Sequence, residues 1–525
     1  MGAPPWPDKP VAPLNRRTFL AGSALAAASA LVRTGPARAA DVDLDFAPAA
    51  DIARAIRRGD VSSTEVTAHV LERIKRYNPR LNAIVTLTED SALERARAAD
   101  EARGRGVWWG PLHGVPCTIK DTFEVAGVRT TAGVASLAQY VPARDAVVVE
   151  RYRAAGAVVL GKTNVPEWAS DWQSYNAVFG VSSNPWDIAR TPGGSSGGEA
   201  AALAAGLSYL GVGSDIAGSI RVPAHFCGIY GHKPTLGVVP LRGHIPPPPG
   251  GPPGPPPTLP VAGPLARSAT DLAFALELLA GPDGDEARAY RWSPLPPRAS
   301  RLSEYRIGFV LDDHRCPVSP EVGTALRDAV DALAKAGAHL DEGWPPGVVP
   351  GEQFDTYLYL LYATLGSQLR DEQLETMRAL ASKKDGSYLT ILAQAWTDPV
   401  KAIQAAGGRR MAARGIWQEY FRTHDAFLLP TEFIPAFPHD QSQPQYARRL
   451  ATPAGPREYY DLFFWISFAT LTGLPATTAP VGLTGGGLPV GIQVIGPYLE
   501  DFTSIDLTGR IAEVVGGFRP PGGYR

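Results

Sequence analysis

Cysteine is scarce in this chain: its 525 residues contain only three, Cys117, Cys227 and Cys316. They are widely spaced and odd in number, and no C-x-x-C pair exists, which excludes the usual zinc and dithiol motifs. No other metal-ligand spacing stands out, and no sequence feature marks one of the three as a nucleophile. We therefore expect three small buried side chains, no metal and no cofactor.

An excess of charge of one sign and long apolar runs are also lacking. The formal net charge is −2, which argues against the basic surface that a nucleic-acid partner would require. No segment offers the roughly 18 unbroken apolar residues of a membrane helix, so we expect no stable membrane association. Hydrophobic residues nevertheless make up 45% of the chain, which is enough for a large core.

The N-terminus has the pattern of an export signal. The pair Arg16-Arg17 precedes an apolar run from Phe19 to Val32, and Ala37-Arg38-Ala39 is an A-x-A site of the kind that signal peptidase accepts. Twin arginines before a weakly apolar segment predict twin-arginine export. We expect residues 1–39 to be a signal peptide, residues 40–525 to be the mature domain, and the protein to be periplasmic or secreted in a bacterium. An uncleaved leader or a misassigned start is the alternative.

Short apolar runs alternate with helical patterns along the rest of the chain. Strands are predicted at 115–119, 157–160 and 305–311, and helices at 145–155 and from Val322 onward. This alternation is typical of an α/β layer structure with a largely buried sheet.

Three local patterns carry further expectations. The stretch Ser62–Glu65 predicts a capping box that opens a helix, which Pro79 should end. The segment 245–260 is almost entirely Pro and Gly and predicts a stiff surface loop. The aromatic-rich stretch 354–362 predicts the core face of a helix rather than a substrate channel.

The densest motif is Thr191–Gly198, where glycines flank the serine pair Ser195-Ser196. The next residues, 199–207, are rich in Ala and predict a helix. The serines should therefore lie at a helix N-terminus, where free N–H groups favour developing negative charge. A Gly/Ser loop alone is weak evidence, because phosphate loops and plain turns look similar. This one lacks the Lys-Ser/Thr ending of a P-loop.

Two further motifs supply a second serine and a lysine. Ser219 lies in the small-residue stretch Gly213–Ala224, and Lys120 ends an apolar strand in Gly110–Asp121. Lysine is seldom fully buried unless it is paired. Burial would lower the pKa of Lys120 from its ordinary value of about 10.4, so that a neutral fraction could act as a base.

Together these motifs resemble the amidase signature family. The resemblance covers nearly the whole mature chain and continues through further blocks in the family's order: Gly161–Asn164, Asn184–Asp187, Gly231–Thr235, Leu471–Pro475 and Leu488–Gln493. It implies a single α/β/α domain around a large mixed β-sheet. It also implies that Lys120 is the base, that Ser195 is a bridging serine held through a cis peptide bond, and that Ser219 is the nucleophile. Ser196 is then a structural neighbour.

The implied reaction is hydrolysis of a linear carboxylic amide. Neutral Lys120 takes a proton from Ser195, which takes one from Ser219, whose oxygen attacks the amide carbonyl. The resulting oxyanion would be stabilised by the backbone N–H groups of Ile216, Ala217, Gly218 and Ser219. The products are a carboxylate and an amine or ammonia, and esters could be cleaved through the same acyl-enzyme.

Two positions need separate expectations. Ala217 stands where the family usually has Gly; if its φ were positive, the methyl group would strain the turn by about 1 kcal/mol. We expect instead that only its N–H group matters and that the methyl group narrows the pocket. Ala169 aligns with a region that lines the acyl pocket in relatives, so we expect it to contact substrate.

Other polar residues are expected to be structural. These are the histidines His113, His225 and His232 and the pair Asp215 and Arg221, which should brace the turn around Ser219. Lys162 ends a strand as Lys120 does, but the family's base aligns only with Lys120.

Two other functions stay open. One is the amidase-fold subunit of a tRNA-dependent amidotransferase, which is cytoplasmic and works with partner subunits. The other is a catalytically inactive binding protein on the same fold. The export signal argues against the first, and the intact Lys120, Ser195 and Ser219 argue against the second. The expected partner is a small-molecule amide, with no nucleic acid, and a homodimer is left open.

Overall fold

The computed structural model describes residues 42–250, 258–366 and 371–525. Residues 42–525 form one compact unit. The predicted signal peptide at 1–39 lies outside the described residues, as do positions 251–257 of the Pro-rich segment. Among the described helices, none combines the length and apolar character needed to cross a membrane.

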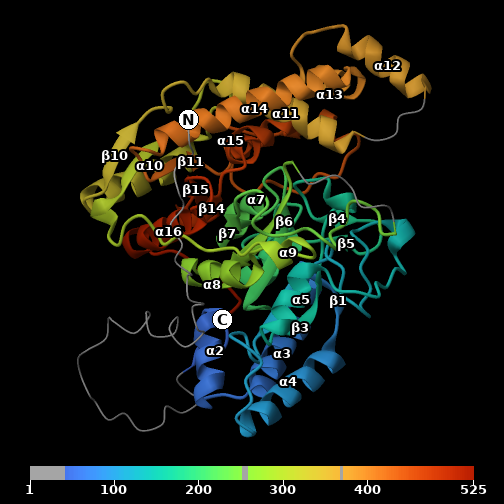
Figure 1. Ribbon diagram of the computed structural model, residues 1–525, viewed down its shortest axis with the longest axis vertical. Coiled ribbons are helices and arrows are strands. Elements are labelled where there is room, and N and C mark those ends of the chain that lie inside the picture. Colours follow the sequence, from blue (N-terminus) through green and yellow to red (C-terminus); the bar gives the residue numbers. More distant parts are fainter. Residues whose placement is uncertain (1–41, 251–257, 367–370) are drawn as a thin grey trace, which may run out of the picture. The chain divides into compact units, whose positions relative to one another are not determined.

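A mixed sheet of 11 strands runs through this unit in the order β1-β3-β2-β6-β8-β7-β14-β15-β11-β9-β10 (Figure 1). Parallel pairs join β3, β2 and β6 on one side and β11, β9 and β10 on the other, whereas the strands between them pair antiparallel. The strands are β1 (Ile84–Leu87), β2 (Pro116–Lys120), β3 (Val158–Thr163), β6 (Leu210–Asp215), β7 (Tyr230–Lys233), β8 (Val261–Ala266), β9 (Arg306–Phe309), β10 (His339–Glu342), β11 (Ala426–Pro430), β14 (Ala476–Leu483) and β15 (Pro489–Ile495). Two short hairpins lie outside the sheet: β4 (Tyr175–Asn176) with β5 (Gly180–Val181), and β12 (Arg449–Leu450) with β13 (Arg457–Glu458).

Helices cover both faces of the sheet. Successive side chains of a strand point to opposite faces. On β8, Ala262 and Ala266 pack in the cluster that contains α8, whereas Leu265 packs in the cluster that contains α7. The predicted α/β/α architecture is therefore confirmed. The α-helices are α2 (Ala49–Arg58), α3 (Ser63–Leu81), α4 (Glu89–Gly104), α5 (Val147–Ala154), α6 (Gly197–Ala204), α7 (Arg221–Cys227), α8 (Ala269–Leu279), α9 (Glu286–Ala289), α10 (Pro320–Lys335), α11 (Pro350–Leu365), α12 (Asp371–Ala381), α13 (Tyr388–Thr397), α14 (Val400–Tyr420), α15 (Phe464–Thr472) and α16 (Asp501–Val515).

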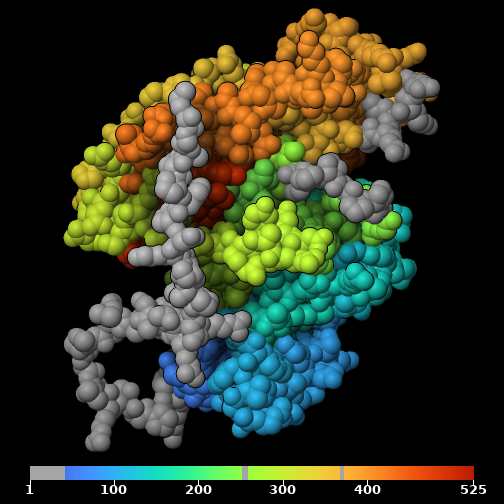
Figure 2. Space-filling view, viewed as in Figure 1, coloured from blue at the N-terminus to red at the C-terminus, as the bar shows by residue number. Residues whose placement is uncertain are grey.

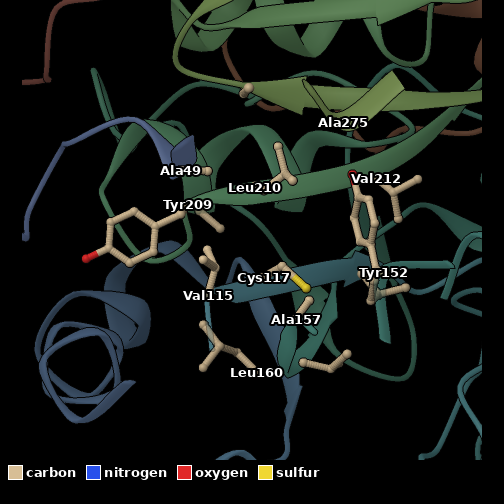
Figure 3. Packing of buried hydrophobic residues seen from close by; sticks show 14 of the residues in the cluster. Ala49, Val115, Cys117, Tyr152, Ala157, Leu160, Tyr209, Leu210, Val212 and Ala275 are labelled. Carbon is tan, nitrogen blue, oxygen red and sulfur yellow. The ribbon is translucent and has the colours of Figure 1, made fainter. Parts of the chain in front are cut away.

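Figures 1 and 2 show how the helices are grouped within the unit. The N-terminal helices α2 to α4 (blue) gather at one end, and helices α11 to α14 (orange) gather at the other. Between them the sheet carries a buried core (Figure 3), in which Cys117 of β2 lies among residues such as Leu210 of β6 and Ala157. All three cysteines are unpaired and buried, as predicted.

The predicted strands and helices are present, with ends displaced by one to three residues. Strands expected at 115–119 and 157–160 are β2 and β3, and the helix expected at 145–155 is α5. The stretch 354–362 lies in α11, where its larger aromatic side chains are buried, as expected of a core face. The described ends of the Pro-rich segment form a surface loop between the buried side chains of Ile245 and Leu259.

The helix after the Ser62 capping box corrects one prediction. The box forms as expected, with the Ser62 side chain accepting from the Glu65 N–H and the Glu65 side chain accepting from the Ser62 N–H. Pro79, however, does not end the helix, which continues to Leu81. Proline removes one N–H group, but its fixed φ is helical, and only Arg80 and Leu81 follow it before the helix ends. The helix ends instead at Asn82, which has a left-handed φ of 47°.

Candidate active site

Two parallel strands and two helix starts converge on the predicted residues. Strand β2 ends at Lys120 and lies parallel to β6, with Ile119 opposite Val212. The carboxyl ends of both strands therefore meet at one edge of the sheet. Helix α6 begins directly after the Ser195-Ser196 pair, and α7 begins two residues after Ser219.

Lys120 is completely buried and faces hydroxyl groups. Its Nζ lies 2.7 Å from Ser195 Oγ and 2.9 Å from Ser214 Oγ, with the Ser214 carbonyl oxygen at 3.4 Å. Burial lowers the pKa of Lys120 to about 7, although the charges of Asp215 and Glu199 oppose that shift. A substantial neutral fraction near neutral pH can therefore accept a proton.

Ser195 and Ser219 occupy adjacent turns. The Gly194–Ser195 peptide bond is cis, as the resemblance implies, and the Ser196 N–H donates to the Ser219 carbonyl oxygen at 3.2 Å. The Ser219 hydroxyl itself makes no hydrogen bond to another residue in the described part of the chain. The Lys120–Ser195 link is thus formed, whereas the Ser195–Ser219 link is open. Such links are often looser without substrate.

Hydrogen bonds donated to its carbonyl groups hold the turn around Ser219 in place. Tyr357 donates its hydroxyl to the Ile216 carbonyl at 3.0 Å, and Trp172 donates its indole N–H to the Ala217 carbonyl at 2.8 Å. The Gly218 and Ser219 carbonyls accept from the N–H groups of Val222 and Ser196. Within the described structure, the N–H groups of Ile216, Ala217 and Ser219 have no such partner and can serve an oxyanion.

Gly218 does not fit the predicted set of oxyanion donors. Its N–H group donates to Asp215 Oδ1 at 2.9 Å, so the structure leaves three of the four predicted donors free. Gly218 also carries the positive φ of this turn, 83°, whereas Ala217 is not among the residues with positive φ. The methyl group of Ala217 therefore causes no backbone strain, as expected.

Asp215 and Arg221 brace the turn as predicted. Both side chains are fully buried, and Arg221 donates Nε to Asp215 Oδ2 at 3.0 Å and Nη2 to Oδ1 at 2.8 Å. The Ile220 N–H adds a bond to the same carboxylate at 3.1 Å. The Arg221 guanidinium and these N–H groups hold the pKa of Asp215 below its usual range despite burial, which by itself would raise it.

A family model described as Amidase matches residues 65–504 of this sequence. The chain belongs to the amidase family. Its curated relatives include a glutamyl-tRNA(Gln) amidotransferase subunit of Moorella thermoacetica, which is 35% identical over 87% of this chain and 95% of the relative. The same subunit of Thermus thermophilus is also 35% identical, over 86% of this chain and 93% of its own.

Solved structures of the family share the fold. The native peptide amidase of Stenotrophomonas maltophilia matches with a TM-score of 0.68 at 30% identity, over 90% of this chain and 98% of that chain. A bacterial aryl acylamidase of the amidase signature family matches with a TM-score of 0.74 at 24% identity, over 92% and 98% of the two chains. The resemblance noted in the sequence is confirmed.

The residues set aside lie in structural networks of the amidase fold. His113 contacts the Ala99 carbonyl, His225 lies between Gly491 and Ile434, and His232 pairs with Asp501. Ser196 is the N-cap residue of α6, and its buried hydroxyl has no hydrogen-bond partner within the described residues. Ala169 lies in the turn Glu167–Ala169, and its contact with substrate stays a prediction.

Sequence reasoning did not predict the contacts that four residues near the amidase motifs make: Ser214, Trp172, Tyr357 and His244. Ser214 directly precedes Asp215 in the second serine motif, and Trp172 lies three positions after Ala169. Tyr357 was assigned to the helix core, but its hydroxyl reaches the turn from α11. No sequence signal indicates His244, which contacts Ser214.

A low pKa alone would not have selected Lys120. Burial also lowers the pKa of Lys233 to about 7, yet its Nζ donates to the Pro234 carbonyl and has no contact with either serine. Geometry therefore distinguishes the two. In the described part of the chain, no cluster of three His, Cys, Asp or Glu residues is arranged to hold a metal ion.

Proposed function

We propose that this chain cleaves a carboxamide through an acyl-enzyme on Ser219, with Lys120 and Ser195 as the proton relay. One observation carries the proposal: a fully buried lysine with a pKa of about 7 lies 2.7 Å from the hydroxyl of Ser195. A buried amine that is partly neutral and in contact with a serine can act as a general base.

Each step uses a group at the site. Lys120 takes the Ser195 proton while Ser195 takes the Ser219 proton, and the Ser219 Oγ–carbon bond forms. The oxyanion then lies within reach of the free N–H groups of Ile216, Ala217 and Ser219. As the C–N bond breaks, the relay returns its proton to the leaving nitrogen, which departs as amine or ammonia. Water then attacks the acyl-enzyme by the same route. The open Ser195–Ser219 link closes when substrate is bound.

The comparisons with known proteins favour one particular role for this amide cleavage. The curated relatives named above are subunits of an amidotransferase that, by its name, acts on glutamyl-tRNA(Gln), and the match spans 95% of one of them. This supports a role as an amidotransferase component better than that of a freestanding amidase. It also bears on the expectation that no nucleic acid takes part, because such a component would act in a complex that serves a tRNA.

A freestanding amidase is the second candidate, and the aromatic side chains packed near the turn around Ser219 favour it. Trp172 packs edge-on against Phe463, with ring centroids 4.4 Å apart, and Tyr357 packs near the same ring. These rings belong to a buried aromatic cluster that contacts the turn around Ser219, and an acyl site bordered by this cluster would suit an apolar acyl group. The match to a peptide amidase supports the same function.

Release of ammonia or amine by the isolated chain separates the candidates. Ser219→Ala is the control for every substrate. An amidotransferase component takes its amino group from an amide donor, and glutamine and asparagine are the amino acids with a primary carboxamide. Turnover of these two alone supports the amidotransferase role, and turnover of peptide amides or anilides supports a freestanding amidase. Absence of any turnover, together with absence of a fluorophosphonate adduct on Ser219 in folded protein, would support the inactive binding protein.

The export prediction becomes a proposal of its own. We propose that the Arg16-Arg17 pair directs export. Export would separate the chain from aminoacyl-tRNA in the cytoplasm, so it would favour the freestanding amidase over the amidotransferase component. Cell fractionation of the full chain and of Arg16→Lys/Arg17→Lys tests this. Periplasmic protein that becomes cytoplasmic in the variant supports export, and cytoplasmic protein in both contradicts it.

A further inference from the structure

His244 lies beside the end of β2, far from the sequence motifs. It follows Gly243 in the segment between β7 and β8, and it forms an isolated bridge with Phe123. The neighbouring Ile245 N–H donates to the Thr122 carbonyl at 2.7 Å. The His244 ring packs edge-on against Phe123, with centroids 5.0 Å apart. These contacts fix a partly buried imidazole next to Lys120.

A chain of hydrogen bonds joins this ring to the base. His244 Nδ1 lies 3.1 Å from the Pro246 carbonyl, and His244 Nε2 lies 2.9 Å from Ser214 Oγ. Ser214 Oγ in turn lies 2.9 Å from Lys120 Nζ.

The chemistry of the groups decides which is the donor and which the acceptor in each hydrogen bond between the Pro246 carbonyl, His244, Ser214 and Lys120. A carbonyl oxygen only accepts, so Nδ1 of His244 carries the proton. In a neutral imidazole Nε2 is then an acceptor, and the Ser214 hydroxyl donates to it. Its oxygen remains free to accept an N–H group from Lys120. Burial and the Lys120 charge lower the pKa of His244 to about 4, so the ring stays neutral at working pH.

This arrangement determines where the lone pair of Lys120 points. A neutral amine has two N–H groups and one lone pair. Because Ser214 accepts from one N–H group and its carbonyl oxygen lies near the amine, the lone pair is left for the Ser195 hydroxyl. Resting on the proposed function, we propose that His244 is a positioning residue: by accepting the Ser214 proton, it aims the Lys120 lone pair at Ser195.

Removal of the ring nitrogen would release a competing donor. In His244→Phe the edge-on contact with Phe123 can be kept, but the Ser214 hydroxyl loses its acceptor and can donate to the Lys120 lone pair. Ser195 then competes with Ser214 for the base. His244→Gln is the matched control, because its side-chain oxygen can accept from Ser214.

The test is the rate at which a fluorophosphonate labels Ser219, measured well above pH 7, where Lys120 is neutral. The Ser219 oxygen forms a bond to phosphorus and fluoride leaves, so no substrate need be known. We expect His244→Phe to slow labelling about tenfold or more and His244→Gln to stay within about threefold of the original rate. The double variant Ser214→Ala/His244→Phe should be no slower than Ser214→Ala, because the competing donor is gone.

Two results would overturn the proposal. One is a folded His244→Phe protein that is labelled at the original rate. The other is a double variant whose loss equals the product of the single losses, which would indicate a merely structural role. Thermal melting shows whether each variant is folded.

A second measurement is made on the unchanged protein and does not need a folded His244→Phe variant. Nitrogen-15 NMR of histidine-labelled protein reports which ring nitrogen carries the proton, and the spectrum of His244→Gln identifies the signal. The Nδ1–H form supports the proposal, and the Nε2–H form contradicts it. If the unchanged protein shows no labelling of Ser219, the proposed function fails, whereas the NMR result still decides the direction of the hydrogen-bond chain.

Discussion

Two lysines on neighbouring strands have the same burial and different partners. Lys120 ends β2, and Lys162 lies on β3 opposite Ile119. Neither side chain has any exposed surface. The Lys120 amine faces the hydroxyls of Ser195 and Ser214, whereas Lys162 Nζ lies 2.9 Å from an Asp121 carboxylate oxygen.

The partners decide what each amine can do. Lys162 donates to Asp121 Oδ1, to the Phe123 carbonyl at 2.8 Å and to Thr130 Oγ1 at 2.9 Å, which uses all three protons of an ammonium group. Burial pulls the pKa of Lys162 below its ordinary value, but the Asp121 charge and hydrogen bond oppose that pull. Burial also lowers the pKa of Lys120, to about 7, and there no carboxylate of the described residues is in contact with the amine. Burial alone therefore does not make a base; a set of neutral partners does.

The largest effect should follow from removal of the Lys120 amine. Lys120→Met is expected to lower the labelling rate of Ser219 by about 10²–10⁴-fold, the usual contribution of a general base. Its stability near neutral pH should not fall, because an apolar side chain of similar length replaces a buried amine that only the unfolded chain holds fully protonated. Labelling kinetics measure the expected loss of rate, and thermal melting measures the expected stability. A loss of less than about tenfold would mean that another group serves as the base.

The same substitution at Lys162 should act on stability. Lys162→Met leaves the buried Asp121 carboxylate without its cation, which is expected to lower the free energy of unfolding by about 3–5 kcal/mol. Denaturant unfolding measures this loss. Lys162→Met/Asp121→Asn is the control and should recover part of it, since no unpaired charge is left. If Lys162→Met is as stable as the original protein, the ion pair is not what distinguishes the two lysines.

The pH dependence of labelling should follow Lys120. Only the neutral amine accepts a proton, so the rate should rise about tenfold per pH unit below a pKa of about 7 and level off above it. Rates measured across this range, with Lys162→Met where it stays folded, test the assignment. The midpoint should be nearly the same in both proteins. A rate that falls steadily above neutral pH would contradict the relay.

The sequence predicts those parts of the site that are local in the chain. The strand that ends at Lys120, the serines at the start of α6, and the Asp215–Arg221 brace each lie within one motif, and the motif order indicates the fold. The contacts that were missed join distant segments. Ser214 of β6 contacts Lys120 of the neighbouring strand β2, and Tyr357 of α11 contacts Ile216. No local sequence pattern predicts either contact.

The errors also have physical causes. Gly218 was predicted as an oxyanion donor because all N–H groups of the turn look equivalent in sequence, but the Asp215 carboxylate takes one of them. Pro79 was predicted to end its helix, but its φ is compatible with a helix, and the chain stays helical for two more residues, to Leu81. Both outcomes depend on which groups the fold brings within hydrogen-bond distance.

The last difference between the two lysines is in how stability varies with pH. The folded pKa of Lys120 is about 7, below its ordinary value of 10.5. Between these values the unfolded chain binds a proton that the folded chain does not, so the free energy of unfolding rises with pH by up to about 1.4 kcal/mol per unit. Below pH 7 both states are charged, and the folded state bears the full penalty of the buried charge.

Lys120→Met removes this contribution and leaves the other titrating groups in place. The difference in unfolding free energy between the original protein and Lys120→Met should therefore shift in favour of the original protein as pH rises from about 7 to about 10. Denaturant unfolding at several pH values measures the difference. If it is flat over this range, Lys120 remains an ammonium group in the folded protein, and the contrast with Lys162 would be lost.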